Sequence, residues 1–334
     1  MMMNKLYHQG ELAVQRRAKV LEQAKNTGQM VSKAMPVGAL AFIQQQPMIV
    51  IGSISSEGEV WASTLFGKPE LGKPAHGKPG LATPGFLYAP DEHTLVIDIS
   101  QSSEGFPLCT SHIDPLWENL KKDADVGLLV IELGTRRRLR INGTIKTVDE
   151  KKLIIAVERC YGNCPKYIQR RHWSIAKGNT LRISRPDTQG TTLGVAQRNL
   201  ITQADTFFVA SAMPGHGVDA SHRGGLPGFV QVLNGRTLYV PDYAGNNMFN
   251  TLGNFESYPH AGLVFIDFAQ GRVLQLMGRP EIIWGVIDTQ EKHLHDDSGG
   301  AHRFWKFEIT RWRESTPSFH LTWELADYSP FLLK

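Results

Sequence analysis

The feature of this 334-residue sequence that most constrains its fold is an internal repeat. Blocks of the first half return in the second half in the same order. The first set is WAS with PGFL, TLVID, LWENL and VGLLVIELGTRRRLRING, at residues 61–63, 84–87, 94–98, 116–120 and 126–143. The second set is DAS with PGFV, TLYVPD, MFNTL and AGLVFIDFAQGRVLQLMG, at residues 219–221, 227–230, 237–242, 248–252 and 261–278. Matches in one order predict a duplicated domain. The alternative is that β-rich segments resemble one another only because strands have similar compositions.

The repeated blocks have the composition of β-strands. They are short runs rich in β-branched residues, separated by Gly, Pro, Asn and Asp, which predicts a mainly β protein of two antiparallel barrels with peripheral helices. One amphipathic helix is expected from Glu11 to Ala24, before Gly28. The expected organisation is an N-terminal helical segment at 1–34, a first barrel at 35–150, a connecting segment at 151–200 and a second barrel at 201–334.

Composition limits the compartment and the partners. The 41% hydrophobic content is enough to give each of two domains a core. Three cysteines are too few for a disulfide framework or a closed zinc site, which favours a reducing compartment. The sequence shows no signal peptide and no run of 18 apolar residues, so we expect a cytoplasmic protein without a membrane span. The net charge of +4 gives little attraction for nucleic acid.

The best candidate for a binding site is the stretch DASHRGGLPGFV in the second half. Ser221, His222 and Arg223 precede Gly224 and Gly225, so a tight turn would present a hydroxyl, an imidazole and a guanidinium together. Arg223 offers a planar fork to a phosphate, and the glycines would let backbone N–H groups approach it. The alternative is a purely structural turn.

A second motif, TLYVPDYAGNNMFNTLGNF, follows in the chain. Asn246 or Asn247 is expected to cap a short helix that runs through Met248 and Leu252 until Gly253. The start of that helix, facing Arg223, would attract an anion, unless the asparagine is an ordinary N-cap.

The first half lacks these features. Ser63 is retained, but Thr64 and Leu65 stand where the second half has an imidazole and a guanidinium. Its helix is expected to begin at Asp114 and Pro115, and a carboxylate there repels an anion. We therefore expect the second half to bind the ligand.

Two other basic segments are candidates for the site. In TRRRLRING, strand alternation would place Arg136, Arg138 and Arg140 on one face. That face either meets the ligand from across an interface between the barrels or is solvated surface. The segment YGNCPKYIQRR is distinctive enough to suggest that Lys166 or Arg170 lies near the ligand.

The order of these motifs resembles the split β-barrel of the pyridoxamine 5′-phosphate oxidase family of FMN-binding proteins. The matching pieces are SHRGG, YVPDYAGNN, FNTLGNFESYPHAGLVFIDF and GRVLQLMGRPEI. The whole chain further resembles the tandem branch known as predicted flavin-nucleotide-binding proteins, over roughly residues 35–285. This resemblance implies two tandem split β-barrels with one FMN at their interface.

The resemblance also implies which residues bind the cofactor: Ser221, His222, Arg223, Gly224, Tyr243, Asn246, Asn247, Asn250, Arg279 and Arg138. The family's phosphate-binding lysine falls at about Asn247, which is uncharged, and this departure leaves vitamin B6 oxidase activity unsupported. Arg279 and His222 are expected to replace part of the missing charge. No catalytic residue is assigned, because a flavin does redox chemistry through its own ring.

The expected function is therefore an FMN-dependent oxidoreductase acting on a small molecule, with electrons from NAD(P)H or another donor. The alternative is a protein that holds haem or flavin without turnover. A homodimer is expected, although a tandem pair can also remain a monomer.

Other functional patterns are weaker. A G-x-G-x-x-A match at 215–220 lacks the helix that a dinucleotide-binding fold requires. His216, Asp219 and His222 lie in a Gly-rich loop that fixes no metal geometry, and residues 293–297 look like a surface loop. A nucleophilic enzyme is disfavoured because no G-x-S-x-G is present. Gly-Lys-Pro begins at 67, 72 and 77, and such an insert is an exposed loop by default.

Overall fold

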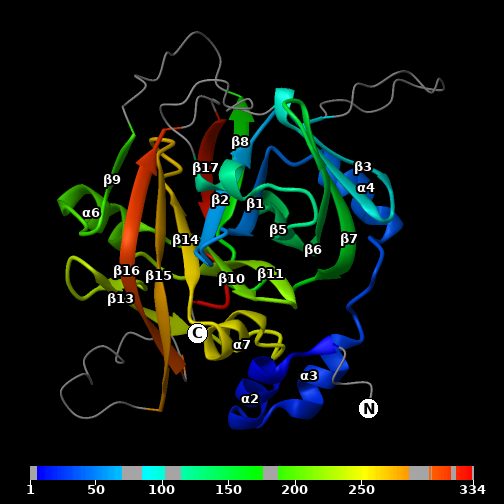
Figure 1. Cartoon of the computed structure of the whole chain (residues 1–334). Helices are drawn as coiled ribbons and strands as arrows, with labels where there is room; N and C mark the ends of the chain where they lie inside the picture. Colours follow the sequence, from blue (N-terminus) through cyan, green and yellow to red (C-terminus); the bar gives the residue numbers. More distant parts are fainter. Residues whose placement is uncertain are drawn as a thin grey trace.

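The computed structural model describes residues 6–69, 85–101, 114–175, 187–285, 301, 303–316 and 321–332. The predicted mainly β fold class is confirmed: two large antiparallel sheets form the body of the protein (Figure 1). The helices are α2 (Gln9–Arg17), α3 (Leu21–Gly28), α4 (Val37–Gln44), α5 (Pro115–Asn119), α6 (Val195–Gln203) and α7 (Asn250–Ser257), with 3-10 turns η1 (Ile99–Gln101) and η2 (Leu133–Thr135). No helix of the described residues is both long enough and apolar enough to cross a membrane.

The two sheets have the same order of strands. The first runs β2 (Val60–Phe66), β1 (Met48–Ile54), β5 (Asp125–Glu132), β6 (Arg137–Val148), β7 (Lys152–Gly162), β4 (Thr94–Asp98) and β3 (Leu87–Asp91). The second runs β11 (Gly217–Gly224), β10 (Thr206–Met213), β14 (Ala261–Ile266), β15 (Val273–Trp284), β16 (Arg303–Ser315), β13 (Thr237–Asp242) and β12 (Gln231–Val232), and β9 (Thr188–Gly190) pairs with β16. The repeated blocks 61–63, 94–98 and 126–143 lie on strands that correspond in sheet order to those of blocks 219–221, 237–242 and 261–278.

The helices α5 and α7 also correspond, in a register that differs from the predicted one. Asn119 donates a hydrogen bond from Nδ2 to Ser53 Oγ at 3.0 Å. Asn254 makes the same bond to Ser211 Oγ at 2.9 Å. Asn119 therefore corresponds to Asn254 and not to Thr251, as the alignment of LWENL with MFNTL had predicted.

Three hydrophobic clusters explain why the central strands are apolar on both faces. One lies inside each sheet, and a third lies between the sheets. Along β1, Ile49 and Ile51 join the first cluster, whereas Met48 and Val50 join the one between the sheets. Because successive side chains of a strand point to opposite faces, such a strand is hydrophobic throughout.

Two corresponding glycines allow the sheets to approach backbone to backbone. A Cβ atom added at Gly127 of β5 would lie 2.4 Å from the carbonyl oxygen of Val218 in β11. A Cβ atom added at Gly262 of β14 would lie 2.4 Å from the amide nitrogen of Ala62 in β2. The contact between the sheets therefore requires a residue without a side chain at both places.

Parts of the expected organisation are corrected. The helix expected from Glu11 to Ala24 is two helices, α2 and α3, because the chain turns at Lys19, which has a φ of +59°. Strand β7 belongs to the first sheet, which therefore extends beyond residue 150. Near the C-terminus, β17 (Leu321–Asp327) lies outside the second sheet and pairs with β8 (Arg170–Ile175) of the connecting segment.

Candidate functional site

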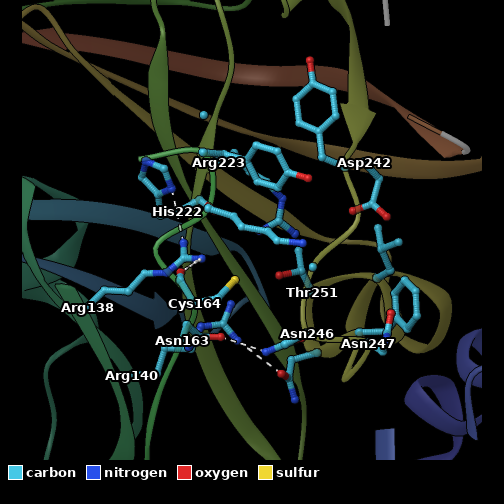
Figure 2. Close-up of a pocket in the computed structure, with 18 residues that line it drawn as sticks. Arg138, Arg140, Asn163, Cys164, His222, Arg223, Asp242, Asn246, Asn247 and Thr251 are labelled. Carbon is cyan, nitrogen blue, oxygen red and sulfur yellow. Dashed lines mark hydrogen bonds between the residues drawn. The ribbon is translucent and has the colours of Figure 1, made fainter. Parts of the chain in front are cut away.

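A pocket lies where β6 of the first sheet meets β11 of the second, between the connecting segment and the start of α7 (Figure 2). Its cavity of about 110 Å³ is open on one side. The lining residues are Arg138, Arg140, Asn163, Cys164, Lys166, Tyr167, His222, Arg223, Gly224, Asp242, Tyr243, Gly245, Asn246, Asn247, Phe249, Asn250, Thr251 and Leu252. We call this cavity the pocket from here on.

Most of the residues predicted to bind a cofactor line the pocket: Arg138, His222, Arg223, Gly224, Tyr243, Asn246, Asn247 and Asn250. Two do not. Ser221 lies behind it, where its hydroxyl is 3.1 Å from the hydroxyl of Thr251. Arg279 lies exposed on β15, opposite Glu308, so it does not supply the missing charge that was expected of it.

Four buried polar atoms of the pocket have no hydrogen-bond partner among the residues that the structure describes: Arg138 Nε, Asn163 Nδ2, His222 Nε2 and Arg223 Nε. Arg138 donates from Nη1 toward His222 Nδ1 at 3.3 Å, and an arginine can only donate. Nδ1 of a neutral His222 is therefore the acceptor, and its unpartnered Nε2 carries the hydrogen. All four atoms are donors, and none of them is paired with an acceptor in the described part of the chain.

Burial and mutual repulsion shape the charges of the pocket. Desolvation, together with Arg140 and Arg223, lowers the pKa of Arg138 to about 10. Desolvation is also the main cause that lowers the pKa of Arg223 to about 10. Both guanidiniums remain charged at neutral pH. Burial beside Arg138 and Arg223 holds the pKa of His222 well below its usual range, so His222 is neutral and does not replace the missing charge as expected.

Arg140 is held by a buried phenol and an amide. It donates from Nη1 to the hydroxyl of Tyr161 at 3.0 Å and to Asn250 Oδ1 at 3.2 Å. Burial lowers the pKa of Arg140, but Tyr161 and Asp219 outweigh that effect and raise it. Arg140 thus points from the first sheet into a pocket whose helix belongs to the second, across the interface.

The carboxylate that lines the pocket offsets only part of this positive charge: it acts to raise the pKa of Arg223, but it is shared with another arginine. Asp242 lies beside Arg303, whose Nε donates to Asp242 Oδ2 at 3.1 Å. Lys166 also lines the pocket, with its ammonium 5.4 Å from the centre of the Phe331 ring. The described lining therefore has an excess of positive charge, which favours an anionic ligand.

The helix expected to start at Asn246 or Asn247 starts later. Its first residue is Asn250, and no side chain caps it, because Phe249 occupies the N-cap position with a left-handed backbone. Asn246 instead accepts from the Met248 amide at 3.1 Å and donates to Asn163 Oδ1 at 2.8 Å. Gly253, expected to end the helix, lies inside it. The Asn246–Phe249 segment is an ordered turn that forms one wall of the pocket.

The connecting segment contributes more of the site than the sequence indicated. Asn163, Cys164 and Tyr167 line the pocket alongside Lys166, and Tyr167 stacks on Tyr243 with ring centres 5.0 Å apart. The distinctive composition of YGNCPKYIQRR was the available signal for these residues.

The two glycines after Arg223 have structural roles. A Cβ atom at Gly224 would lie 1.9 Å from the carbonyl oxygen of Tyr167, so this glycine lets the connecting segment pass. The N–H group of Gly225 is bonded to the carbonyl of Asp205 at 3.0 Å and is not free for a phosphate.

Two predicted basic residues lie elsewhere. Arg136 precedes β6 in a left-handed conformation and pairs with Asp327, so it does not share the face of Arg138 and Arg140. Arg170 pairs with the same carboxylate and does not line the pocket.

The corresponding place in the first half of the interface is filled by a carboxylate. Asp114 Oδ1 accepts from Ser63 Oγ at 2.7 Å and from the Leu116 amide at 2.9 Å, at the start of α5. Asp114 Oδ2 accepts from Gln275 Nε2 at 3.0 Å. By strand pairing, Gln275 corresponds to Arg140 and Ser63 corresponds to Ser221. We call this place the Asp114 position.

The metal ligands weighed from the sequence are not gathered. Among the described residues, no group of three or more His, Cys, Asp and Glu side chains has a metal-binding arrangement. His222 faces the pocket, whereas Asp219 accepts from Asn142 and Asn254. Residues 293–297, and most of the Gly-Lys-Pro insert, lie outside the described residues.

Comparison with known proteins yields structural matches only. No protein-family model and no curated protein match the sequence. The solved structures matched include a candidate pyridoxamine 5′-phosphate oxidase from Lactobacillus delbrueckii, at 15% identity and a TM-score of 0.30, covering 37% of this chain and 94% of that one. They also include an FAD-binding protein from Mesorhizobium loti, at 16% identity and a TM-score of 0.28, covering 39% and 99%. A third, from Clostridium acetobutylicum, is related to general stress protein 26 and described as of the pyridoxinephosphate oxidase family, at 12% identity and a TM-score of 0.27, covering 39% and 92%. Likeness at this level carries no argument for function.

Proposed function

We propose that this protein is a flavoprotein that holds the phosphate of one FMN in the pocket and uses the flavin to oxidise or reduce a small molecule. The observation that carries the proposal is the set of four unpartnered buried donors in the pocket, two of which belong to the charged guanidiniums of Arg138 and Arg223. Leaving such donors unpaired costs about 1–3 kcal/mol each, and a phosphate group offers several acceptor oxygens and a matching charge.

The dimensions of the pocket fit a phosphate group. A cavity of about 110 Å³ is smaller than the roughly 300–1,000 Å³ of pockets that enclose whole ligands, and it accommodates an oxyanion. The remainder of the ligand would extend out of the pocket. The stacked rings of Tyr167 and Tyr243, which line the pocket, offer an aromatic face to it. When bound, the flavin ring supplies the redox chemistry.

The Asp114 position supports the same assignment from within the chain. There, an oxyanion of the protein itself lies against a hydroxyl, a helix amide and the Gln275 side chain. In the pocket, the corresponding helix α7 starts at Asn250, and Arg140 stands where the first half has that glutamine. Asp114 therefore lies against the neutral amide of Gln275 in one half, whereas the other half has the guanidinium of Arg140 at the corresponding position.

The test is a titration of apoprotein with FMN and with riboflavin, which lacks the phosphate. Wild-type protein should prefer FMN. Arg223→Leu, which installs the residue of the first half, should raise the Kd for FMN by about 10- to 100-fold, the loss of one charged hydrogen bond, and leave that for riboflavin unchanged. Arg279→Leu is the matched control, because Arg279 is exposed outside the pocket. Unchanged FMN binding by Arg223→Leu would place the phosphate elsewhere.

Turnover is tested on the same protein. Mass spectrometry of a ligand released by heat identifies the flavin. Bleaching of its spectrum by NADH or NADPH, with recovery in air, supports an oxidoreductase with a nicotinamide donor. A flavin that no donor bleaches, or colourless protein that takes up haem, would instead indicate a binding protein without turnover. The homodimer stays a prediction, and light scattering tests it by measuring the molar mass in solution.

A further inference from the structure

The N-terminal helix α2 lies outside both sheets and packs across α7, the helix that borders the pocket (Figure 1). The crossing is close: a Cβ atom at Gly10 would lie 2.2 Å from the carbonyl oxygen of Gly253, and one at Gly253 would lie 2.5 Å from Glu11 Cα. The side chain of Gln15 also donates to the Met248 carbonyl at 2.9 Å. The helix α2 is therefore fixed against the wall of the pocket.

A chain of hydrogen bonds leads from α2 to a pocket arginine. Asn250 donates from Nδ2 to Glu11 Oε1 at 2.5 Å. This bond orients the amide so that Asn250 Oδ1 faces Arg140 Nη1 at 3.2 Å and the Tyr161 hydroxyl at 3.3 Å. If Asn250 were turned over, its NH₂ group would face the donors of Arg140. The acceptor on α2 thus determines which end of Asn250 meets Arg140.

A second branch fixes Glu11 itself. The His8 amide donates to Glu11 Oε2 at 2.8 Å, and His8 Nδ1 accepts from the Gly10 amide. His8 Nε2 therefore carries the hydrogen and donates to Asn254 Oδ1 at 2.8 Å, while Asn254 Nδ2 donates to Asp219 Oδ2. Each polar atom in this branch acts either as a donor or as an acceptor, so these hydrogen bonds determine the position of the Glu11 carboxyl group.

Among the residues that the structure describes, no such helix covers the corresponding surface of the first half. Counting back from the pair Asn119 and Asn254, Pro115 stands where α7 has Asn250, and proline has no amide to present. In place of α2, a cavity of about 610 Å³ lies beside Pro115 and Asn119. Within the described part of the chain, α2 thus packs on the half of the interface that has the arginines, and no described helix packs on the other half in this way.

We propose that Glu11 is a positioning residue for the pocket, which acts on Arg140 through Asn250 and couples anion binding to the uptake of a proton. The proposal rests on the proposed function for the identity of the anion. It adds that a segment outside both sheets sets the pH response of binding.

The surroundings of Glu11 give the direction of this coupling. The titratable groups around it are Asp219 of β11, His216 of the turn before β11, Arg159 and Tyr161 of β7, Arg140 of β6, and Tyr7 and His8 of its own segment. Burial, and then the charge of Asp219, raise the pKa of Glu11 to about 8, so Glu11 is mostly protonated at pH 7. A bound dianion beside Arg140 would raise this pKa further. Binding therefore takes up a proton, and affinity falls as pH rises above about 8.

The experiment measures the Kd of FMN from pH 7 to pH 9, where the phosphate is already doubly ionised. In wild-type protein the Kd should rise several-fold, with a limit of tenfold per pH unit for one proton. Glu11→Gln keeps one oxygen for Asn250, loses the acceptor of the His8 amide and cannot ionise, so whatever its Kd is at pH 7, that Kd should stay flat to pH 9. Glu11→Ala removes that oxygen and should weaken binding at every pH. Glu22→Gln, an exposed carboxylate of α3, is the control.

Failure of this proposal is distinguishable from failure of the FMN assignment. If FMN does not bind, sulfate replaces it as a dianion that does not titrate, and calorimetry in two buffers at pH 8 counts the protons taken up. Wild-type protein should take up a measurable fraction of a proton per sulfate, and Glu11→Gln none. The proposal is overturned if Glu11→Gln retains the wild-type pH dependence, if Glu11→Ala binds as wild type does, or if neither anion binds to folded protein.

Discussion

The pocket and the Asp114 position occupy corresponding places in one interface, yet they meet the same requirement in opposite ways. Each has a buried serine behind it, Ser221 or Ser63, and a helix that starts beside it. In the first half, the protein's own Asp114 satisfies the donors. In the second, arginines replace neutral residues and four donors stay without partners. The two halves thus share a backbone arrangement, and on the proposed function the side chains decide whether an oxyanion comes from the protein itself or from a ligand.

The largest effect should come from emptying the Asp114 position. Asp114→Ala leaves the Ser63 hydroxyl, the Leu116 amide and the Gln275 side chain without their acceptor, so unfolding free energy should fall by about 3 kcal/mol. Urea denaturation measures the loss. Added formate should restore part of the stability of Asp114→Gly if the place accepts an oxyanion. If Asp114→Ala were as stable as wild-type protein, the bonds of Asp114 would not stabilise the fold, and the comparison between the Asp114 position and the pocket would fail.

The correspondence of the two halves is tested by the interface glycines. Gly127→Ala and Gly262→Ala each press a Cβ atom to within 2.4 Å of the facing backbone and should each cost about 1–3 kcal/mol. Thermal unfolding measures both. Similar losses are expected, and a large loss at only one glycine would show that the sheets pack unequally.

A third change makes the pocket resemble the first half. Strand pairing places Val273 where β6 has Arg138, so Arg138→Val removes one guanidinium by a substitution that the fold already contains. The Kd for FMN should rise by roughly 30-fold, which corresponds to about 2 kcal/mol. Fluorescence titration gives the value, and Arg279→Val serves as the control. Equal loss of riboflavin binding would mean that the residue supports the pocket rather than the phosphate.

The smallest expected effect concerns His222, which Thr64 replaces in the first half. Its pKa is lowered in the folded protein, so the unfolded chain binds more protons as pH falls below about 6.5, and stability decreases. Wild-type protein should lose about 1 kcal/mol more than His222→Thr between pH 6.5 and pH 5.5. His8 contributes in both proteins and cancels. Parallel stability curves would show that His222 is already charged in the fold.

The sequence was most informative where local patterns act within one strand. Alternation along β6 correctly predicted that Arg138 and Arg140 share a face, and the repeat indicated which strands correspond. The same alternation failed for Arg136, because the chain turns through a left-handed residue before the strand begins. Strand alternation therefore predicts side-chain direction only for residues within the strand itself.

The sequence was least informative where distant segments meet. The start of α7 depends on Phe249 and on packing against α2, so a capping rule applied to Asn246 and Asn247 placed it too early. The bond between Glu11 and Asn250 joins residues from opposite ends of the chain, and no periodicity reports it. The exposure of Arg279 likewise depends on how β15 lies in the second sheet.

The location of both large sheets on one polypeptide has a consequence for how this interface can change. Where two identical subunits meet about a twofold axis, every substitution appears at both symmetry-related places. Here Gln275 and Arg140 are separate codons, so one place can gain a cation while the other keeps its carboxylate. One half of the interface can therefore keep Asp114 as a permanent internal contact, while the other half remains open to the proposed ligand.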